Sequence, residues 1–202
     1  MITEHRSEQV YVQKDVTSNP APLGLLGFGM TTILLNLHNA GFFELDSMII
    51  GMGIFMGGIA QVIAGMQEWK KNNTFGATAF TAYGCFWLSL VALWIIPKTE
   101  FGAAFKSSEN AVAWYLLLWG VFTFFMFIGT LRLSRVLQVI FFTLTLLFFL
   151  LAISDFSGSA SLKVFAGYEG ILCGLSALYG CAAQVLNEVY KRPVLPEGKI
   201  SN

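Results

Sequence analysis

Charged residues are scarce in this 202-residue chain: only 12% are Asp, Glu, Lys or Arg, against about 25% in typical soluble domains. Hydrophobic residues make up 55% of the sequence, and the mean hydropathy is +0.66. The 12 basic and 12 acidic residues cancel, so the chain offers no electrostatic surface for nucleic acid. The composition therefore predicts an integral membrane protein that lies in the lipid bilayer and has no nucleic-acid partner.

Histidine and catalytic motifs are also nearly missing. The two histidines are His5 and His38, and the sequence contains no H-E-x-x-H, G-x-S-x-G, C-x-x-C or phosphate-binding Gly-Lys-Ser pattern. The three cysteines lie in apolar stretches, where they act as small packing residues. We therefore expect no metal, no cofactor and no enzymatic activity.

Six stretches are apolar over roughly the 20 residues that a helix needs to cross a bilayer. The predicted fold is all-α: a polytopic membrane protein with six transmembrane helices per protomer and a pathway among them. The expected organisation is a polar tail over 1–18, a transport domain over 19–190 and a second tail over 191–202. The predicted spans are 22–39, 47–66, 77–96, 113–131, 137–153 and 164–187.

The basic residues predict the orientation of the chain. Nine of the twelve fall on the side of the two termini and three on the opposite side, which by the positive-inside rule places both termini in the cytoplasm. The protein is therefore expected to be a multi-pass protein of the cell inner or plasma membrane. No Lys or Arg lies near the middle of a predicted span, so a fixed positive charge for an anion is missing there.

Polar side chains inside the spans are functional candidates by default. On the first span, helical spacing aligns Gly24, Phe28, Thr31, Leu35 and His38 in one stripe. A threonine in a membrane helix can equally bond its own backbone, so that alternative stays open. The polar candidates for the pathway are Asn19, Gly24, Thr31, Asn36, His38, Asn39 and Gln61, and the candidates for a proton-linked role are His38, Glu169 and Glu188.

The first span begins with an unusual run, N-P-A-P-L-G-L over residues 19–25. Proline is tolerated in the first helical turn, so Asn19 is expected to cap a helix with Pro20 and Pro22 just inside. The first free N–H groups are then expected near Leu23 and Gly24. Two interpretations follow: an anion site at the positive end of the helix dipole, or a rigid entry turn at the membrane surface.

The sequence resembles the acetate uptake transporter family, and most closely its bacterial succinate–acetate permeases. The resemblance covers the chain from Asn19 to Pro196. It rests on N-P-A-P-L-G-L at 19–25, G-F-G-M-T-T at 27–32, N-L-H-N at 36–39, M-G-I-F at 52–55, G-G-I-A-Q at 57–61, N-T-F-G at 73–76, L-W-G-V-F at 118–122, G-T-L at 129–131 and V-L-N-E at 185–188.

This resemblance implies six-helix protomers assembled into a homohexamer, each with its own pathway for acetate and, in bacterial forms, succinate. It further implies a narrow hydrophobic constriction made by Phe28, Tyr83 and Leu144. A small residue of the last helix that is associated with substrate size matches Ala177, so substrate selectivity is expected to depend on Ala177 and Leu144.

The mechanism stays open at this stage between proton symport and an anion channel. Protonating a carboxylate with a reference pKa of about 4.3 costs roughly 3.7 kcal/mol at pH 7. Moving it as an unpaired anion through an apolar ring costs far more, on the order of tens of kcal/mol. Two other functions remain as alternatives: an ammonium or ammonia conductor, prompted by fungal relatives, and a membrane sensor that transports nothing.

Overall fold

The computed structural model describes residues 17–200, so the predicted tail over 1–18 lies almost entirely outside the described residues. Within the described range, six helical segments are long and apolar enough to cross a membrane, which confirms the predicted all-α, six-span architecture. Each lies within four residues of its predicted bounds. They are Ala21–Asn39, Ser47–Lys70, Thr74–Lys98, Glu109–Thr130, Arg135–Ser157 and Ala160–Tyr190.

Short polar side chains fix where most of these helices begin. Asp46 accepts hydrogen bonds from two amides of the following turn, and Asn73, Ser108, Ser134 and Ser159 each accept one. These bonds satisfy backbone donors that lack a partner within the first turn. The connections between spans are short apart from 99–108, which carries the 3₁₀ turn η3 (Ala103–Phe105) after η2 (Ile96–Lys98).

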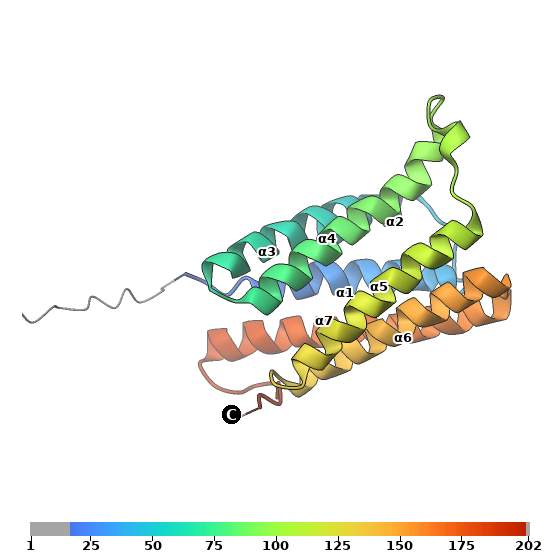
Figure 1. Cartoon of the computed structure of the whole chain (residues 1–202). Helices are drawn as coiled ribbons and strands as arrows, with labels where there is room; N and C mark the ends of the chain where they lie inside the picture. Colours follow the sequence, from blue (N-terminus) through green and yellow to red (C-terminus); the bar gives the residue numbers. More distant parts are fainter. Residues whose placement is uncertain (1–16, 201–202) are drawn as a thin grey trace, which may run out of the picture.

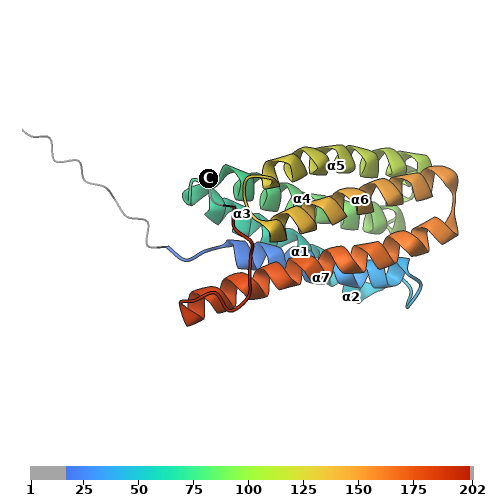
Figure 2. The ribbon, with the colours of Figure 1, turned by 90° about the horizontal axis from the view of Figure 1, so that it is seen from below.

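The helix α1 (Ala21–Asn39) lies in the middle of the bundle, between the pair formed by α3 (Gln61–Lys70) and α4 (Thr74–Ile95) and the three helices that follow α4 in the chain (Figure 1). On the other side, α5 (Glu109–Thr130) packs on α6 (Arg135–Ser157), and α6 packs on α7 (Ala160–Tyr190). The start of α1 and the C-terminal end lie at the same end of the bundle (Figure 2).

Glycine allows the close packing of α1 against α7. A Cβ at Gly174 would lie 2.8 Å from the carbonyl oxygen of Gly29, and one at Gly29 would lie 2.9 Å from the oxygen of Gly174. Any side chain at either position would force the two backbones apart. Small residues at such positions are the usual means by which membrane helices approach each other.

The second span is not a regular α-helix throughout. It begins as α2 (Ser47–Met52), continues as a π-helix, η1 (Gly53–Ala60), and ends as α3. The Thr31 hydroxyl donates to the carbonyl oxygen of Met52 at 3.3 Å, at the point where the hydrogen-bonding pattern changes. The wider π turns end directly at Gln61, whose side chain is buried within the bundle. Helices with π turns are rare and gather at functional sites.

The start of α1 differs from the sequence prediction. The helix begins at Ala21 with Pro20 at the cap position, and Asn19 Oδ1 accepts from the Ala21 amide at 3.1 Å. The amides of Leu23 and Gly24 both donate to the Pro20 carbonyl, at 3.1 and 3.5 Å. The prediction of free amides near these two residues is therefore wrong, because the carbonyl oxygen of Pro20, three and four residues earlier, accepts from both. The rigid-turn interpretation fits this geometry and the anion site does not.

Candidate functional site

Phe28, Tyr83 and Leu144 meet in the interior, each from a different helix: α1, α4 and α6. All three are almost fully buried, with exposed fractions of 6%, 3% and 3%. The rings of Phe28 and Tyr83 lie 6.2 Å apart between centroids and are tilted by 49°. The Tyr83 hydroxyl donates to Thr123 Oγ1 on α5 at 2.9 Å, which holds the ring in place.

Three cavities follow one another along the bundle, and they share walls. The loop vestibule, where α1 ends and α7 begins, and a central chamber are both lined by Phe28, Tyr83 and Leu144. The central chamber and the terminal vestibule, at the end that carries both termini, share other walls: Leu25, Ala79, Phe80 and Phe141. The three cavities therefore define one pathway with a constriction on each side of the chamber.

Both constrictions are closed in this structure. The central chamber has a volume of about 20 Å³, which is room for about one water molecule, whereas the terminal vestibule has about 470 Å³. A carboxylic acid with several heavy atoms does not fit the chamber unless the surrounding rings move. Opening the pathway therefore requires displacement of Phe28 or Leu144 on one side of the chamber and of Phe80 or Phe141 on the other.

The loop vestibule carries a polar strip along α1. Asn36 Nδ2 donates to the Thr32 carbonyl oxygen at 2.9 Å, and Asn39 Nδ2 donates to Asn36 Oδ1 at 3.1 Å. These bonds orient the two amides along the cavity wall, while Asp155 and Lys163 line the cavity from α6 and α7. The vestibule thus pairs an apolar wall with a few oriented polar groups, as small-molecule sites commonly do.

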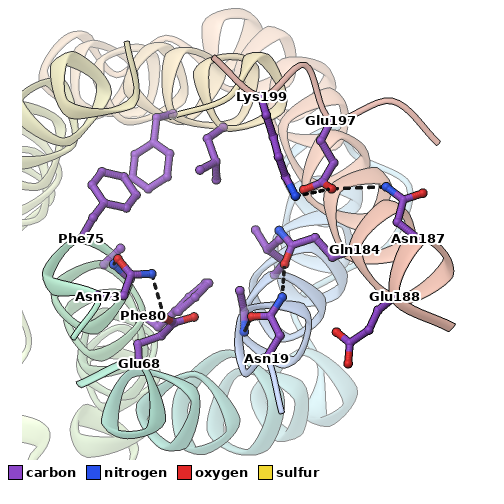
Figure 3. Close-up of a pocket in the computed structure, with 16 residues that line it drawn as sticks. Asn19, Glu68, Asn73, Phe75, Phe80, Gln184, Asn187, Glu188, Glu197 and Lys199 are labelled. Carbon is purple, nitrogen blue, oxygen red and sulfur yellow. Dashed lines mark hydrogen bonds and ion pairs between the residues drawn. The ribbon is translucent and has the colours of Figure 1, made fainter. Parts of the chain in front are cut away.

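The terminal vestibule is rich in polar and charged side chains (Figure 3). Glu68 is 2% exposed, and its Oε2 accepts from Asn73 Nδ2 at 2.7 Å. Asn19 Nδ2 donates to Gln184 Oε1 at 2.9 Å, which ties the start of α1 to α7. Glu188 also lines this vestibule, at its exposed side.

Buried polar atoms without a hydrogen-bond partner are concentrated along this pathway. Among the described residues, Thr32 Oγ1 and Trp87 Nε1 belong to the loop vestibule, Gln61 Oε1 to the chamber and Glu68 Oε1 to the terminal vestibule. Such atoms are costly to bury, so each calls for a functional explanation. All three cavities contain at least one, as expected for a pathway that polar solutes pass through.

The remaining predicted residues lie away from the three cavities. Thr31 faces the second span, and His38 Nδ1 lies 2.9 Å from the carbonyl oxygen of Phe43 in the next loop. The two oxygens of Glu169 are buried without a partner, yet the residue lines none of the three cavities.

Two small predicted residues also lie outside the three cavities. Gly24 gives room to Phe80, since a Cβ there would overlap the Phe80 ring. Ala177 is fully buried and lines none of the three cavities.

Sequence reasoning missed Thr32, Glu68 and Trp87 as site residues. Thr32 lies four residues after Phe28 and Thr31 lies three after it, and a period of 3.6 allows either to share the face of Phe28. Glu68 lies close to the charged end of its span, where acidic residues are common. A signal for it was the nearby Asn73, which caps α4 and also holds the carboxylate.

The fold and the pathway together define a polytopic helical membrane protein of the transporter and channel class. The sequence matches the model of the GPR1/FUN34/yaaH family over residues 4–201, and the chain belongs to this family. The family resemblance derived from the sequence is thereby confirmed.

Two bacterial matches and one fungal match illustrate the relationship. The chain is 58% identical over 182 residues to the succinate-acetate/proton symporter SatP of Escherichia coli K12, covering 90% of this chain and 96% of that protein. A solved structure of the bacterial acetate channel SatP matches with a TM-score of 0.88, covering 90% of this chain and 99% of the other. Ammonia transport outward protein 2 of Saccharomyces cerevisiae is 37% identical, covering 83% of this chain and 61% of that protein.

Proposed function

We propose that this protein carries acetate and other small carboxylates, succinate among them, across the membrane through the pathway in each protomer. The observation that carries the proposal is a series of buried side-chain atoms without a hydrogen-bond partner in consecutive cavities: Thr32 Oγ1 and Trp87 Nε1, then Gln61 Oε1, then Glu68 Oε1. The printed names of the bacterial relatives, a succinate-acetate/proton symporter and an acetate channel, support the same substrate class.

The central chamber determines what form of the substrate passes. Gln61 is its polar wall, and an amide offers both a donor, which suits a carboxylate, and an acceptor, which suits the O–H of the neutral acid. Protonation costs roughly 3.7 kcal/mol at pH 7 for a carboxyl of ordinary pKa, far less than stripping the bare anion of water. A proton that travels with the substrate therefore lowers the barrier, and on this ground we propose symport.

Flux of labelled acetate into liposomes that contain the purified full-length chain tests the function. A pH gradient, acidic outside, is expected to drive internal acetate above its external concentration, and unlabelled succinate is expected to compete. An anion channel would instead give a current that follows the acetate gradient and ignores the pH gradient. Acetate-insensitive flux of methylammonium would favour an ammonium conductor, and absence of any flux would favour a sensor.

Glu68 is the group we assign to proton coupling, ahead of His38 and Glu169, which lie outside the cavities. It is buried at the edge of the terminal vestibule, and one carboxylate oxygen has no partner. The other charged groups that line this vestibule are Glu188, Glu197 and Lys199. Glu68→Gln is expected to abolish acetate accumulation driven by a pH gradient while retaining exchange of labelled for unlabelled acetate.

The matched control for this prediction is Glu188→Gln, which removes an exposed carboxylate from the same vestibule. It is expected to retain both accumulation and exchange. Equal loss of accumulation and exchange in Glu68→Gln would assign Glu68 a structural role, and full accumulation in that variant would exclude it from proton coupling.

The assembly and the orientation belong to the same proposal. Large apolar side chains on α5 are exposed on the protomer, among them Leu118 at 67% and Phe125 at 65%. Lipid or neighbouring protomers must cover them, and together with the family resemblance they support a homohexamer. The excess of basic residues on the terminal side supports cytoplasmic termini in a cell inner or plasma membrane.

A further inference from the structure

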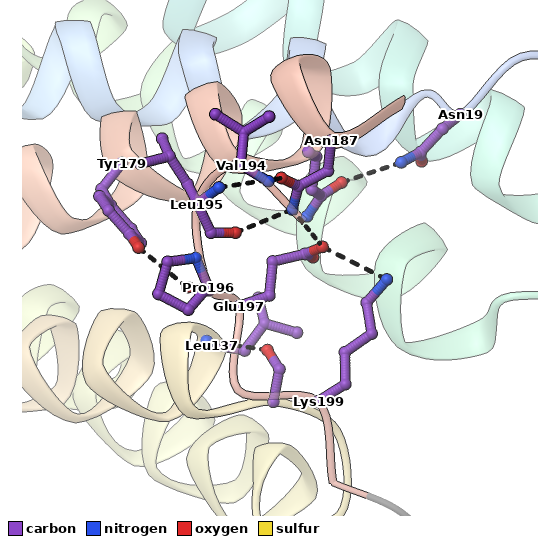
Figure 4. Close-up of polar contacts among 11 residues, drawn as sticks. Asn19, Leu137, Tyr179, Asn187, Val194, Leu195, Pro196, Glu197 and Lys199 are labelled. Carbon is purple, nitrogen blue, oxygen red and sulfur yellow. Dashed lines mark hydrogen bonds and ion pairs between the residues drawn. The ribbon is translucent and has the colours of Figure 1, made fainter. Parts of the chain in front are cut away.

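The last described residues of the chain, 191–200, turn back from the end of α7 and cross to the start of α6 (Figure 4). We call this segment the C-terminal strap. The side chain of Asn187 holds its first half: Oδ1 accepts from the amides of Val194 and Leu195 at 2.7 and 3.0 Å. Its Nδ2 donates to the Leu195 carbonyl at 2.9 Å and lies 3.2 Å from Glu197 Oε1. One half-buried amide thus fixes the path of the segment.

The second half of the strap is fixed to the first turn of α6. The carbonyl oxygen of Gly198 accepts from the Arg135 amide at 2.9 Å, and that of Glu197 accepts from the Val136 amide at 3.2 Å. Gly198 has a φ of +61°, a backbone conformation in which glycine carries no steric penalty. The strap carbonyls therefore satisfy helix amides that no residue of α6 can reach.

This attachment makes the strap a wall of the terminal vestibule. Glu197 and Lys199 line that cavity, and the Lys199 ammonium lies 3.3 Å from Glu197 Oε1. Both side chains lie at the wall of the vestibule (Figure 3), and the side chain of Lys199 is 77% exposed whereas that of Glu197 is 14% exposed. Of the described residues that line the vestibule, Lys199 alone carries a positive charge, while Glu68, Glu188 and Glu197 are acidic.

The charge balance at this mouth has a direct consequence for a carboxylate. Three acidic groups disfavour its approach, and among the described residues that line the vestibule Lys199 supplies the counter-charge. An ion pair as exposed as this one contributes little stability, because water and salt screen it. A substrate carboxylate can therefore take the place of Glu197 on Lys199 at little cost, since one carboxylate replaces another.

We propose that Lys199 recruits the substrate carboxylate at the terminal vestibule and that Glu197 competes with the substrate for it. The proposal rests on the proposed function, carboxylate transport, and adds a specificity-determining residue at the entrance. The strap thereby serves as part of the transport pathway in addition to closing the end of α6.

Opposite charge changes test the proposal in the full-length chain reconstituted in liposomes. Equilibrium exchange of labelled acetate reports on both mouths whatever the orientation of the protein. Lys199→Gln is expected to raise the half-saturation concentration for acetate about two- to fivefold, and Glu197→Gln is expected to lower it. Glu197→Gln keeps a side-chain oxygen that can accept the hydrogen bond from Asn187 Nδ2, so this contact is preserved. Both shifts are expected to shrink at 1 M salt, where the Debye length is about 3 Å.

Two further variants serve as controls. Lys199→Arg keeps the charge and is expected to behave as the unmodified protein. Lys191→Gln removes an exposed charge at the start of the strap that does not line the vestibule, and is expected to leave exchange unchanged. A shift of Lys199→Gln and Glu197→Gln in the same direction, or no shift in either, would overturn the role of Lys199. Absence of acetate exchange in the unmodified protein would instead refute the proposed function itself.

Discussion

Leu144→Ala is expected to raise the ratio of lactate to acetate transport by about tenfold or more. Leu144 is 3% exposed and separates the loop vestibule from the central chamber, so shortening its isobutyl side chain to a methyl group widens the constriction without changing charge. Even one methylene in an apolar pocket changes discrimination by about 10- to 200-fold. The measurement is initial uptake of labelled lactate and acetate into liposomes at one pH.

The control for the widened constriction is Leu146→Ala on the same helix. Leu146 is 39% exposed and lines none of the three cavities, so the same chemical change is made outside the pathway. Its lactate-to-acetate ratio is expected to stay at that of the unmodified protein. An unchanged ratio in Leu144→Ala, or an equal change in both variants, would remove Leu144 from the constriction. A thermal melt of each variant accompanies the assay, because a buried Leu→Ala change costs about 2–5 kcal/mol of stability.

Gln61→Met is expected to lower acetate transport about tenfold or more while leaving thermal stability equal or higher. Gln61 is 1% exposed, lines the chamber and has an unpartnered Oε1. Removing a buried acceptor that lacks a partner relieves a penalty of about 1–3 kcal/mol, and Met preserves the shape. The same change takes away the polar contact that a carboxyl group meets in the chamber. Transport therefore falls without a loss of thermal stability, a result that a damaged fold cannot give.

Gln67→Met is the comparison for the chamber prediction. It makes the same substitution six residues further along the second span, where the side chain is exposed. Transport and melting temperature are both expected to remain unchanged. If Gln61→Met transports acetate at the full rate, the chamber needs no polar group, and the substrate crosses it without an amide contact.

The helical spans follow from the sequence because they depend on local properties. An uninterrupted apolar run of about 20 residues has few stable alternatives in a bilayer, where each backbone polar group needs a partner within its own helix. The starts of the helices at Asp46, Asn73, Ser108 and Ser134 follow from local capping chemistry as well. The predicted starts of α4, α5 and α7 nevertheless lay three to four residues too far along the chain. At α1 the expectation of free amides was wrong, because the Pro20 carbonyl accepts from them.

The constriction residues illustrate the limit of this approach. Phe28, Tyr83 and Leu144 lie on three helices and are separated by more than 50 residues of sequence each time, so no periodicity connects them. The family resemblance supplied them, and the structure brings them together at the boundary of two cavities. The choice between Thr31 and Thr32 was equally out of reach of periodicity, since it depends on how α1 is rotated against the second span.

The sequence by itself determined the membrane class, the six spans and the family, because hydropathy, caps and motifs are local or linear properties of the chain. The tertiary structure alone decided which polar groups line the pathway and which face other helices. It also decided that residues 191–200 form a wall of the terminal vestibule, with Lys199 at its rim. The physical reason is that these properties depend on helix rotation, on π turns in the second span and on contacts between residues far apart in the chain.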